Sequence, residues 1–163
     1  MTGYEKSLES ELKHFGENHN RTVIRKFQLA DIHRKLTEFD QAKKLLYSAI
    51  ETDLADEYLS HKATSYCILG LVYRETKEFE KAKESLLTSL EIGIKSLGEN
   101  HHFVATYHIH LTSIYQDLDK IEKAILHAKK SHEIYLRIFG EEHPKTKNSL
   151  SWLGTLQNQN KES

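Results

Sequence analysis

The sequence contains one cysteine, one proline, one tryptophan and seven glycines in 163 residues. A single cysteine excludes an internal disulfide framework, and so few prolines and glycines leave long helices uninterrupted. No apolar run approaches the roughly 20 residues of a membrane span, and the N-terminal residues lack the apolar core of a signal peptide. We therefore expect a cytoplasmic protein without a membrane partner.

The sequence also lacks an excess of either charge, because Lys and Arg together number 23 and Asp and Glu together number 24. Phosphate binding requires an excess of Lys and Arg on one face, so we expect no nucleic-acid partner.

Chemical motifs are equally scarce. Histidines are frequent, but His108 and His110 are two residues apart and point to opposite sides of a helix, so they cannot readily share an ion. No Cys-x-x-Cys, His-Glu-x-x-His, Gly-rich phosphate loop or Gly-x-Ser-x-Gly turn occurs. Cys67 lies in an expected packed helix, where a small buried or groove-lining residue is favoured over a nucleophile. We expect no metal, no cofactor and no catalytic activity.

What the sequence does contain is repetition. Gly-Glu-Asn-His occupies residues 16–19 and 98–101, and Gly-Glu-Glu-His occupies residues 140–143. Other columns recur in register with this phrase, at intervals of 40, 42 and 42 residues. These columns are Leu29, Leu69, Leu111 and Leu153; Ala30, Gly70, Thr112 and Gly154; and Ala42, Ala82 and Ala124. Internal repetition of this length indicates a repeat architecture.

Each repeat reads as two helices. Apolar residues in 79–97 step by three or four, which is one face of a helix, and residues 63–76 show the same spacing. A short polar break separates the two segments. The small residue in the Gly70 column and the alanine in the Ala82 column predict a close approach of the two helices.

The pattern of Tyr66, Leu69-Gly70, Tyr73 and Ala82 resembles the tetratricopeptide repeat family, whose ordinary period is about 34 residues. The longer period and the Gly-Glu-x-His-Pro junction are similar to its kinesin light chain subgroup. The resemblance implies an all-α, right-handed superhelical α-solenoid of about eight helices in antiparallel pairs. That subgroup usually carries paired asparagines near its groove. Here the corresponding positions are Phe27-Gln28, Cys67-Ile68, Ile109-His110 and Ser151-Trp152, so its cargo chemistry is not carried over.

In this register the chain is one repeat domain over residues 1–163. It comprises a half unit (4–16), three units (19–55, 59–97 and 101–139) and a terminal helix (143–160). The repeated glycines are expected to end helices in the left-handed conformation, and His19, His101 and His143 are expected to be junction residues. The junction at residues 54–60 lacks the phrase and should be irregular.

The resemblance also implies that the first helix of each pair lines a concave groove. The residues it places there are Phe27, Gln28, Asp31, Arg34, Cys67, Ile68, Leu71, Arg74, Ile109, His110, Ser113, Gln116, Trp152 and Thr155. Arg34 and Arg74 share a column, so their guanidinium groups should lie about 10 Å apart and suit an acidic partner. In the alternative reading they neutralise Asp31 and Glu75. Trp152 is either a groove anchor or buried against a neighbouring helix.

These observations favour a non-catalytic protein-interaction module, a scaffold or adaptor that binds a peptide segment of another protein in the groove. Two alternatives remain open. The end helices, each lacking a neighbour, could stack on other copies and form a homo-oligomer, or the array could be a sensor of a peptide signal.

Overall fold

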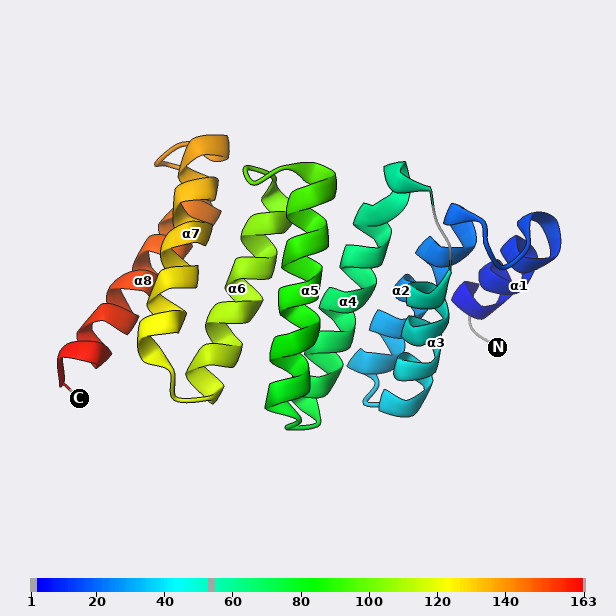
Figure 1. Cartoon of the computed structure of the whole chain (residues 1–163), viewed down its shortest axis with the longest axis horizontal. Helices are drawn as coiled ribbons and strands as arrows, with labels where there is room; N and C mark the ends of the chain where they lie inside the picture. Colours follow the sequence, from blue (N-terminus) through cyan, green and yellow to red (C-terminus); the bar gives the residue numbers. More distant parts are fainter. Residues whose placement is uncertain (1–2, 53–54, 163) are drawn as a thin grey trace. The chain divides into compact units, whose positions relative to one another are not determined.

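The computed structural model describes residues 3–52 and 55–162, and every regular element in these ranges is helical. The elements are α1 (Gly3–Phe15), α2 (Asn20–Lys35), α3 (Phe39–Glu51), the 3-10 helix η1 (Asp56–Tyr58), α4 (Leu59–Glu75), α5 (Phe79–Leu97), α6 (His102–Asp117), α7 (Ile121–Phe139) and α8 (Pro144–Glu162) (Figure 1). The expected all-α fold of consecutive helix pairs is confirmed. None of the described helices is both long enough and apolar enough to cross a membrane.

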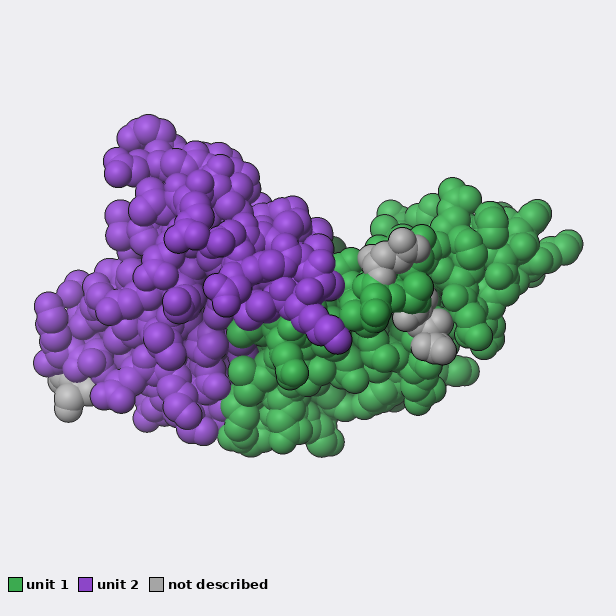
Figure 2. All heavy atoms as spheres, turned by 45° about the horizontal axis from the view of Figure 1, so that its top comes forward, with its two compact units in different colours: residues 1–92 green, residues 93–163 purple. Residues whose placement is uncertain are grey.

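The chain divides into two compact units, residues 1–92 and 93–163, and the boundary falls inside α5 (Figure 2). In unit 1, α2 packs against α1, α3 and α4. In unit 2, α7 packs against both α6 and α8.

The turn inside each helix pair has the same backbone geometry in all three repeats. Thr37, Lys77 and Asp119 have φ angles of 61°, 62° and 55°, in the left-handed region. In the first turn, the Glu38 amide donates to the His33 carbonyl at 2.8 Å and the Thr37 amide donates to the Arg34 carbonyl at 2.9 Å. These two bonds define the Schellman motif that ends a helix.

The Gly-Glu-x-His phrase forms the junction between repeats, as expected. Gly16, Gly98 and Gly140 have φ angles of 80°, 83° and 78° and end α1, α5 and α7. The following histidine then caps the next helix: Nδ1 of His101 accepts a hydrogen bond from the Phe103 amide at 3.2 Å.

His19 and His143 make the equivalent bonds at the starts of α2 and α8, at 3.2 Å and 3.1 Å. These bonds satisfy a helix-terminal donor that would otherwise lack a partner. The fourth junction lies partly outside the described residues; its described part contains η1 and the start of α4.

Packing inside a pair depends on the small-residue column. A Cβ atom on Gly70 would lie 2.7 Å from Cγ of Leu86 and 3.2 Å from the carbonyl oxygen of Ala82, so α4 and α5 approach closely there. In unit 2 the Gly70 position holds Thr112 and the Leu86 position holds Ala128. A larger residue on the first helix is thus matched by a smaller one on the second. The leucine column is buried throughout: Leu29, Leu69, Leu111 and Leu153 are 4%, 3%, 0% and 8% exposed.

Candidate binding surfaces on the first helices

Unit 1 contains a hollow of about 270 Å³ bordered by α1, α2 and α4. Its lining residues are Tyr4, Phe27, Gln28, Asp31, Ile32, Lys35, Thr64 and Ile68. Four of these were predicted groove residues: Phe27, Gln28, Asp31 and Ile68. The repeat register thus brings side chains from two first helices to one depression.

The charged groups beside this hollow are already paired. Arg34 donates to Asp31 from Nε at 2.9 Å and from Nη2 at 2.8 Å, and its Nη1 also donates to Glu75. Lys35 lies 2.8 Å from the second Asp31 oxygen. Burial alone would raise the pKa of Asp31, but the hydrogen bonds from Lys35 and Arg34 outweigh it and lower that pKa. The Arg34 guanidinium is therefore held by two carboxylates of its own chain.

The other predicted residues of unit 1 differ in exposure. Cys67 is only 6% exposed, and burial raises the pKa of its thiol to about 12, so the thiol remains protonated and unreactive at neutral pH. Leu71 and Arg74 are half-buried on α4.

Unit 2 contains a second hollow of about 250 Å³, bordered by α6, α7 and α8. Its lining residues are Ile109, Tyr135, Lys145, Asn148, Ser149 and Trp152. Trp152 is half-buried in its wall, with Ile109 from the neighbouring first helix. Nζ of Lys145 lies 5.7 Å from the ring centre of Tyr135 and 5.7 Å from that of Phe139, so this charge sits beside an aromatic surface.

The remaining predicted residues of unit 2 lie elsewhere on α6 and α8. His110, Ser113 and Gln116 are half-buried, and Thr155 is exposed. The hydroxyls of Ser113 and Thr155 donate to carbonyls one turn earlier in their own helices, at 3.4 Å and 3.1 Å.

Sequence reasoning missed Ile32, Lys35, Thr64, Lys145, Asn148 and Ser149, which lie on first helices outside the predicted columns. It also missed Tyr4 and Tyr135, because it looked for groove residues on first helices only. Tyr135 belongs to α7, the second helix of its repeat, and Tyr4 belongs to α1, which the sequence predicts to be the second helix of a half unit. No periodic signal in the sequence marks these two tyrosines as different from other apolar residues of second helices.

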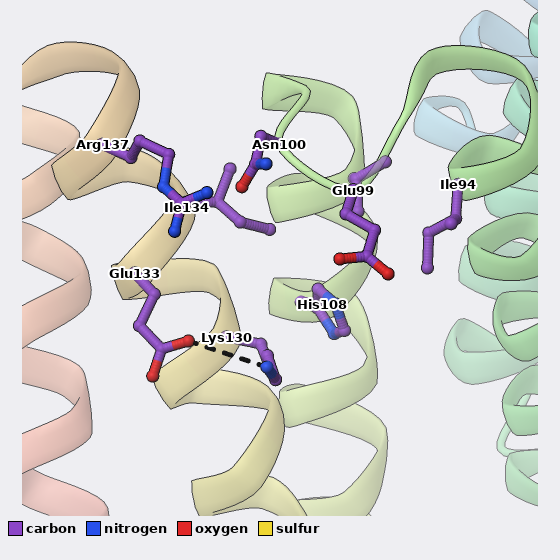
Figure 3. A pocket seen from close by; sticks show the side chains of 9 residues that line it. Ile94, Glu99, Asn100, His108, Lys130, Glu133, Ile134 and Arg137 are labelled. Atoms are coloured by element: carbon purple, nitrogen blue, oxygen red, sulfur yellow. Dashed lines mark ion pairs between the residues drawn. The ribbon is translucent and has the colours of Figure 1, made fainter.

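A third cavity of about 270 Å³ in unit 2 is lined by residues from the end of α5, the loop that follows it, α6 and α7 (Figure 3). His108 lies in its wall, and its Nδ1 is 2.8 Å from Nδ1 of His127. Tyr115 stacks on His127 with ring centres 5.2 Å apart. Burial lowers the pKa of both histidines to about 4, and for His108 the neighbouring His127 and Lys130 contribute as well. This pair is therefore neutral at pH 7, with one ring donating and the other accepting.

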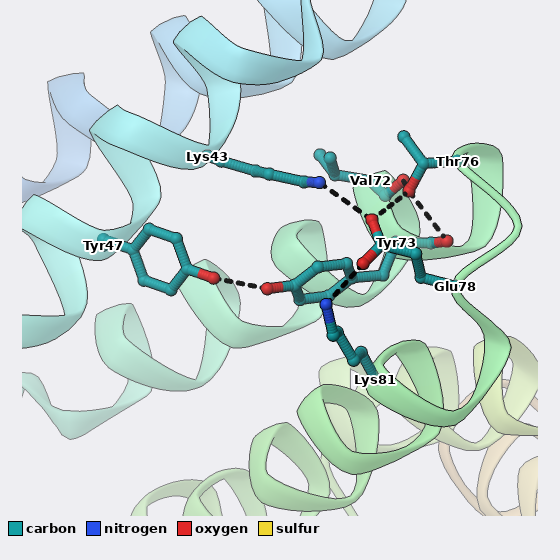
Figure 4. A network of polar contacts seen from close by, with 7 residues as sticks. All are labelled: Lys43, Tyr47, Val72, Tyr73, Thr76, Glu78 and Lys81. Carbon is teal, nitrogen blue, oxygen red and sulfur yellow. Dashed lines mark hydrogen bonds and ion pairs between the residues drawn. The ribbon is translucent and has the colours of Figure 1, made fainter.

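In unit 1 a polar network joins α3 to the turn between α4 and α5 (Figure 4). Glu78 accepts hydrogen bonds from Lys81 at 2.6 Å and from Lys43 at 2.9 Å, which lower its pKa to about 2. The same lysines lie over the Tyr73 ring, at 5.5 Å and 4.9 Å, and the Tyr73 hydroxyl is bonded to that of Tyr47. The polar groups of these residues form hydrogen bonds and ion pairs with one another. The network therefore links two repeats, and few of its donors and acceptors remain for a ligand.

Metal chemistry has no geometric support in the part of the chain that the structure describes. No group of three or more His, Cys, Asp or Glu side chains there could hold an ion.

Comparison with known proteins identifies the repeats. Two family models, each described as tetratricopeptide repeat, match residues 26–56 and residues 61–137. A clustered mitochondria protein homolog of Danio rerio is 26% identical over 161 residues, which is 98% of this chain and 12% of that protein. The Homo sapiens homolog is 30% identical over 91 residues, 56% of this chain and 7% of that protein. The chain thus spans only a small part of the curated relatives it matches.

Solved structures show the same fold. The apo form of RapI superposes with a TM-score of 0.80 at 21% identity, covering 98% of this chain and 56% of that one. BtubC of P. vanneervenii gives a TM-score of 0.77 at 23% identity, over 98% and 68% of the two chains. The kinesin light chain TPR-like repeats of Podosopora anserina give 0.73 at 20% identity, over 98% and 78%.

Proposed function

Because the chain belongs to the tetratricopeptide repeat family, we propose that it is a non-catalytic module that binds a segment of another protein on its first helices. Such repeats generally mediate protein–protein interactions, and proteins of this fold are generally non-catalytic scaffolds. One observation carries the proposal: in each unit, predicted residues from separate helices border a single hollow.

The unit 2 hollow has the chemistry of an anchor site. Trp152 and Ile109 are only half-buried in the free protein and offer aromatic and apolar surface, and the buried Tyr135 also lines the hollow. Aromatic residues in such hollows commonly dominate binding energy, because they bury a large rigid surface. Lys145 adds a positive charge at the same place. The segment that fits is therefore one with an apolar side chain close to an acidic one.

A preference for acidic partners is better supported by Lys145 than by Arg34. The Arg34 guanidinium already donates hydrogen bonds to Asp31 and Glu75, and a partner carboxylate would have to displace one of these carboxylates. The unit 1 hollow contributes mainly Phe27, Ile68 and the Gln28 amide, whose oxygen accepts from Arg25 at 3.0 Å. It suits an apolar or polar uncharged stretch of the partner.

The test is affinity capture followed by direct titration. Immobilised wild-type chain and the double variant Trp152→Ala/Lys145→Glu are exposed to the same lysate, and proteins enriched by the wild type are identified by mass spectrometry. The binding segment of an enriched protein is then titrated calorimetrically. We expect the double variant to bind at least about tenfold more weakly, since losing an aromatic anchor commonly costs about 2 kcal/mol or more.

The matched control is Leu126→Ala/Lys129→Glu, which changes an exposed apolar residue and an exposed lysine on α7. This control should bind as the wild type does. Equal weakening by both double variants, or no weakening by Trp152→Ala/Lys145→Glu, would assign binding to another surface.

A further inference from the structure

The cavity beside His108 in unit 2 combines a buried, mostly apolar floor with a charged rim (Figure 3). The floor consists of Val104, His108 and Ile134, all of which are buried. The volume of about 270 Å³ lies just below the roughly 300–1,000 Å³ of sites for drug-sized ligands. The cavity therefore suits a smaller molecule, whose apolar part the floor can cover.

The floor adds no charge to the cavity at neutral pH. Burial lowers the pKa of His108 to about 4, with further contributions from His127 and Lys130, so its ring is uncharged at pH 7. Nδ1 of His108 lies 2.8 Å from Nδ1 of His127, which leaves Nε2 as the ring nitrogen available to a ligand. Charge in the cavity therefore comes from the rim.

The charges of the rim come from two sides of the cavity. Figure 3 shows Lys130 and Arg137 extending from α7, whereas Glu99 extends from the loop that follows α5. Glu99 and Arg137 are exposed, and neither side chain has a hydrogen bond or an ion pair within the described ranges. The cavity thus presents a cation without a partner on one side and a carboxylate without a partner on the other.

Lys130 adds a second cation to the α7 side. Its Nζ lies 3.8 Å from Oε2 of Glu133, and both side chains are more than half exposed. An exposed pair of this kind contributes little to stability, so Lys130 remains able to bind an anion. Its effect on the pKa of His108 indicates that its charge acts on the floor of the cavity.

This set of polar groups is not part of the repeat pattern. Thr88 and Ser48 stand at the Lys130 position in the two earlier repeats, and Tyr66 stands at the His108 position one repeat earlier. Residues that only pack the repeats together recur in register, as the leucine and alanine columns do. The absence of Lys130 and His108 from the other repeats favours a role in binding over a role in stacking.

A ligand that fits the rim carries both charges. A molecule with only a carboxylate would lie beside Glu99, and a molecule with only an ammonium group would face Lys130 and Arg137, and such contacts between like charges are unfavourable. An α-amino acid has its ammonium group and its carboxylate on the same carbon, so it can meet both sides of the cavity at once. Inside a peptide chain these charges are lost to amide bonds, so the free molecule fits better.

We propose that this cavity binds a free α-amino acid with an aliphatic side chain. Arg137 and Lys130 hold the carboxylate by charge-assisted hydrogen bonds, and Glu99 accepts hydrogen bonds from the ammonium group. The aliphatic side chain packs on Val104 and Ile134. The cavity shares no lining residue with the two hollows on the first helices, so this site does not depend on the proposed function.

The probe is L-leucine, titrated into the isotopically labelled full chain and followed by NMR, with the ring signals of His108 as the local reporter. We expect saturable shifts of these signals and a Kd below about 1 mM. Two analogues separate the charges: 4-methylpentanoate is leucine without its ammonium group, and 3-methylbutylamine is leucine without its carboxylate. Each should bind at least about tenfold more weakly, because a charged group of the rim is left without a partner.

Two variants test the rim and three controls locate the site. Arg137→Gln and Glu99→Gln each remove one charge from an exposed side chain, and each should weaken leucine binding at least about tenfold. The matched controls Lys95→Gln and Glu141→Gln remove the same charges at the corresponding positions one repeat earlier and one repeat later, outside the cavity. Both controls should bind leucine as the wild type does. Trp152→Ala, which removes the aromatic anchor of the unit 2 hollow, should also leave leucine binding unchanged.

Absence of saturable shifts with up to about 10 mM leucine would overturn the proposal. Leucine binding that Arg137→Gln and Glu99→Gln both leave unchanged would overturn it as well, as would shifts that are confined to residues away from His108. Equal affinities for leucine and 4-methylpentanoate would show a simple anion site and would overturn recognition of the ammonium group by Glu99.

Discussion

At the scale of single residues, three glycines inside helices have different surroundings that the sequence does not distinguish. A Cβ on Gly70 would collide with Leu86, and a Cβ on Gly93 would lie 2.5 Å from the Tyr107 ring. Gly154 has open space around it. The repeat register predicted close helix approach at the Gly70 and Gly154 positions alike, but a close approach exists only where a second helix is packed.

Replacing Gly70 by alanine should therefore destabilise the protein. Alanine favours the helix by about 1 kcal/mol, but overpacking against Leu86 and the Ala82 carbonyl costs about 1–3 kcal/mol. We expect a net loss of roughly 1 kcal/mol in the free energy of unfolding, measured by urea denaturation followed by circular dichroism.

Gly154→Ala is the matched control, because it makes the same change in an uncrowded helix. It should leave stability unchanged or raise it by up to about 1 kcal/mol. Equal stabilisation by the two substitutions would show that α4 and α5 are not tightly packed at Gly70.

At the scale of elements, helix positions followed from the sequence more closely than helix ends did. The period of three to four residues located the helices, and the glycine of each junction was correctly expected to have a positive φ. The turn within each pair was predicted only as a polar break. Its left-handed residues are Thr37, Lys77 and Asp119, which share no residue type that would signal this conformation.

Thr37 is the least suited of these to its conformation, because a β-branched side chain at positive φ is strained. Thr37→Gly should raise the free energy of unfolding by about 1 kcal/mol. The measurement is thermal and urea unfolding of the full chain.

The control for this prediction is Thr76→Gly. Thr76 comes one residue before the left-handed Lys77, and its own φ is −85°, so glycine at this position relieves no strain. Thr76 also donates to Glu78 at 2.9 Å, so its replacement should be destabilising. If Thr37→Gly lowered stability as well, the left-handed turn would not be strained.

At the scale of the whole molecule, stability should depend on pH through the His108–His127 pair. Both pKa values are lowered to about 4, mainly by burial, whereas the unfolded chain titrates near the ordinary value of 6.5. Between these values the unfolded state binds more protons, so the pair's contribution is complete above about pH 6.5 and is lost as pH falls towards 4. We expect a loss of roughly 2–4 kcal/mol between pH 7 and pH 5, about 2 kcal/mol for each ring that stays neutral in the folded state.

The comparison variant is His108→Tyr/His127→Ser, which installs the residues found at these positions one repeat earlier, Tyr66 and Ser85. It removes both titrating rings and leaves His61 and His102, whose pKa values are also lowered by burial, unchanged. Its unfolding free energy, measured by urea denaturation, should fall less between pH 7 and pH 5. Parallel pH profiles for the two proteins would mean that the pair is not buried in solution.

The sequence alone indicated the family, the helical class and the repeat register, and it included among its expected groove residues some of those that line the hollows, namely Phe27, Gln28, Asp31, Ile68, Ile109 and Trp152. It could do so because these features depend on periodicity and on columns of like residues, which are local properties of the chain. Only the tertiary structure showed that Arg34 is held by Asp31 and Glu75, that His108 meets His127, and that Gly70 is crowded while Gly154 is open. These facts depend on which side chains from distant segments come together, and that is settled by packing between helices.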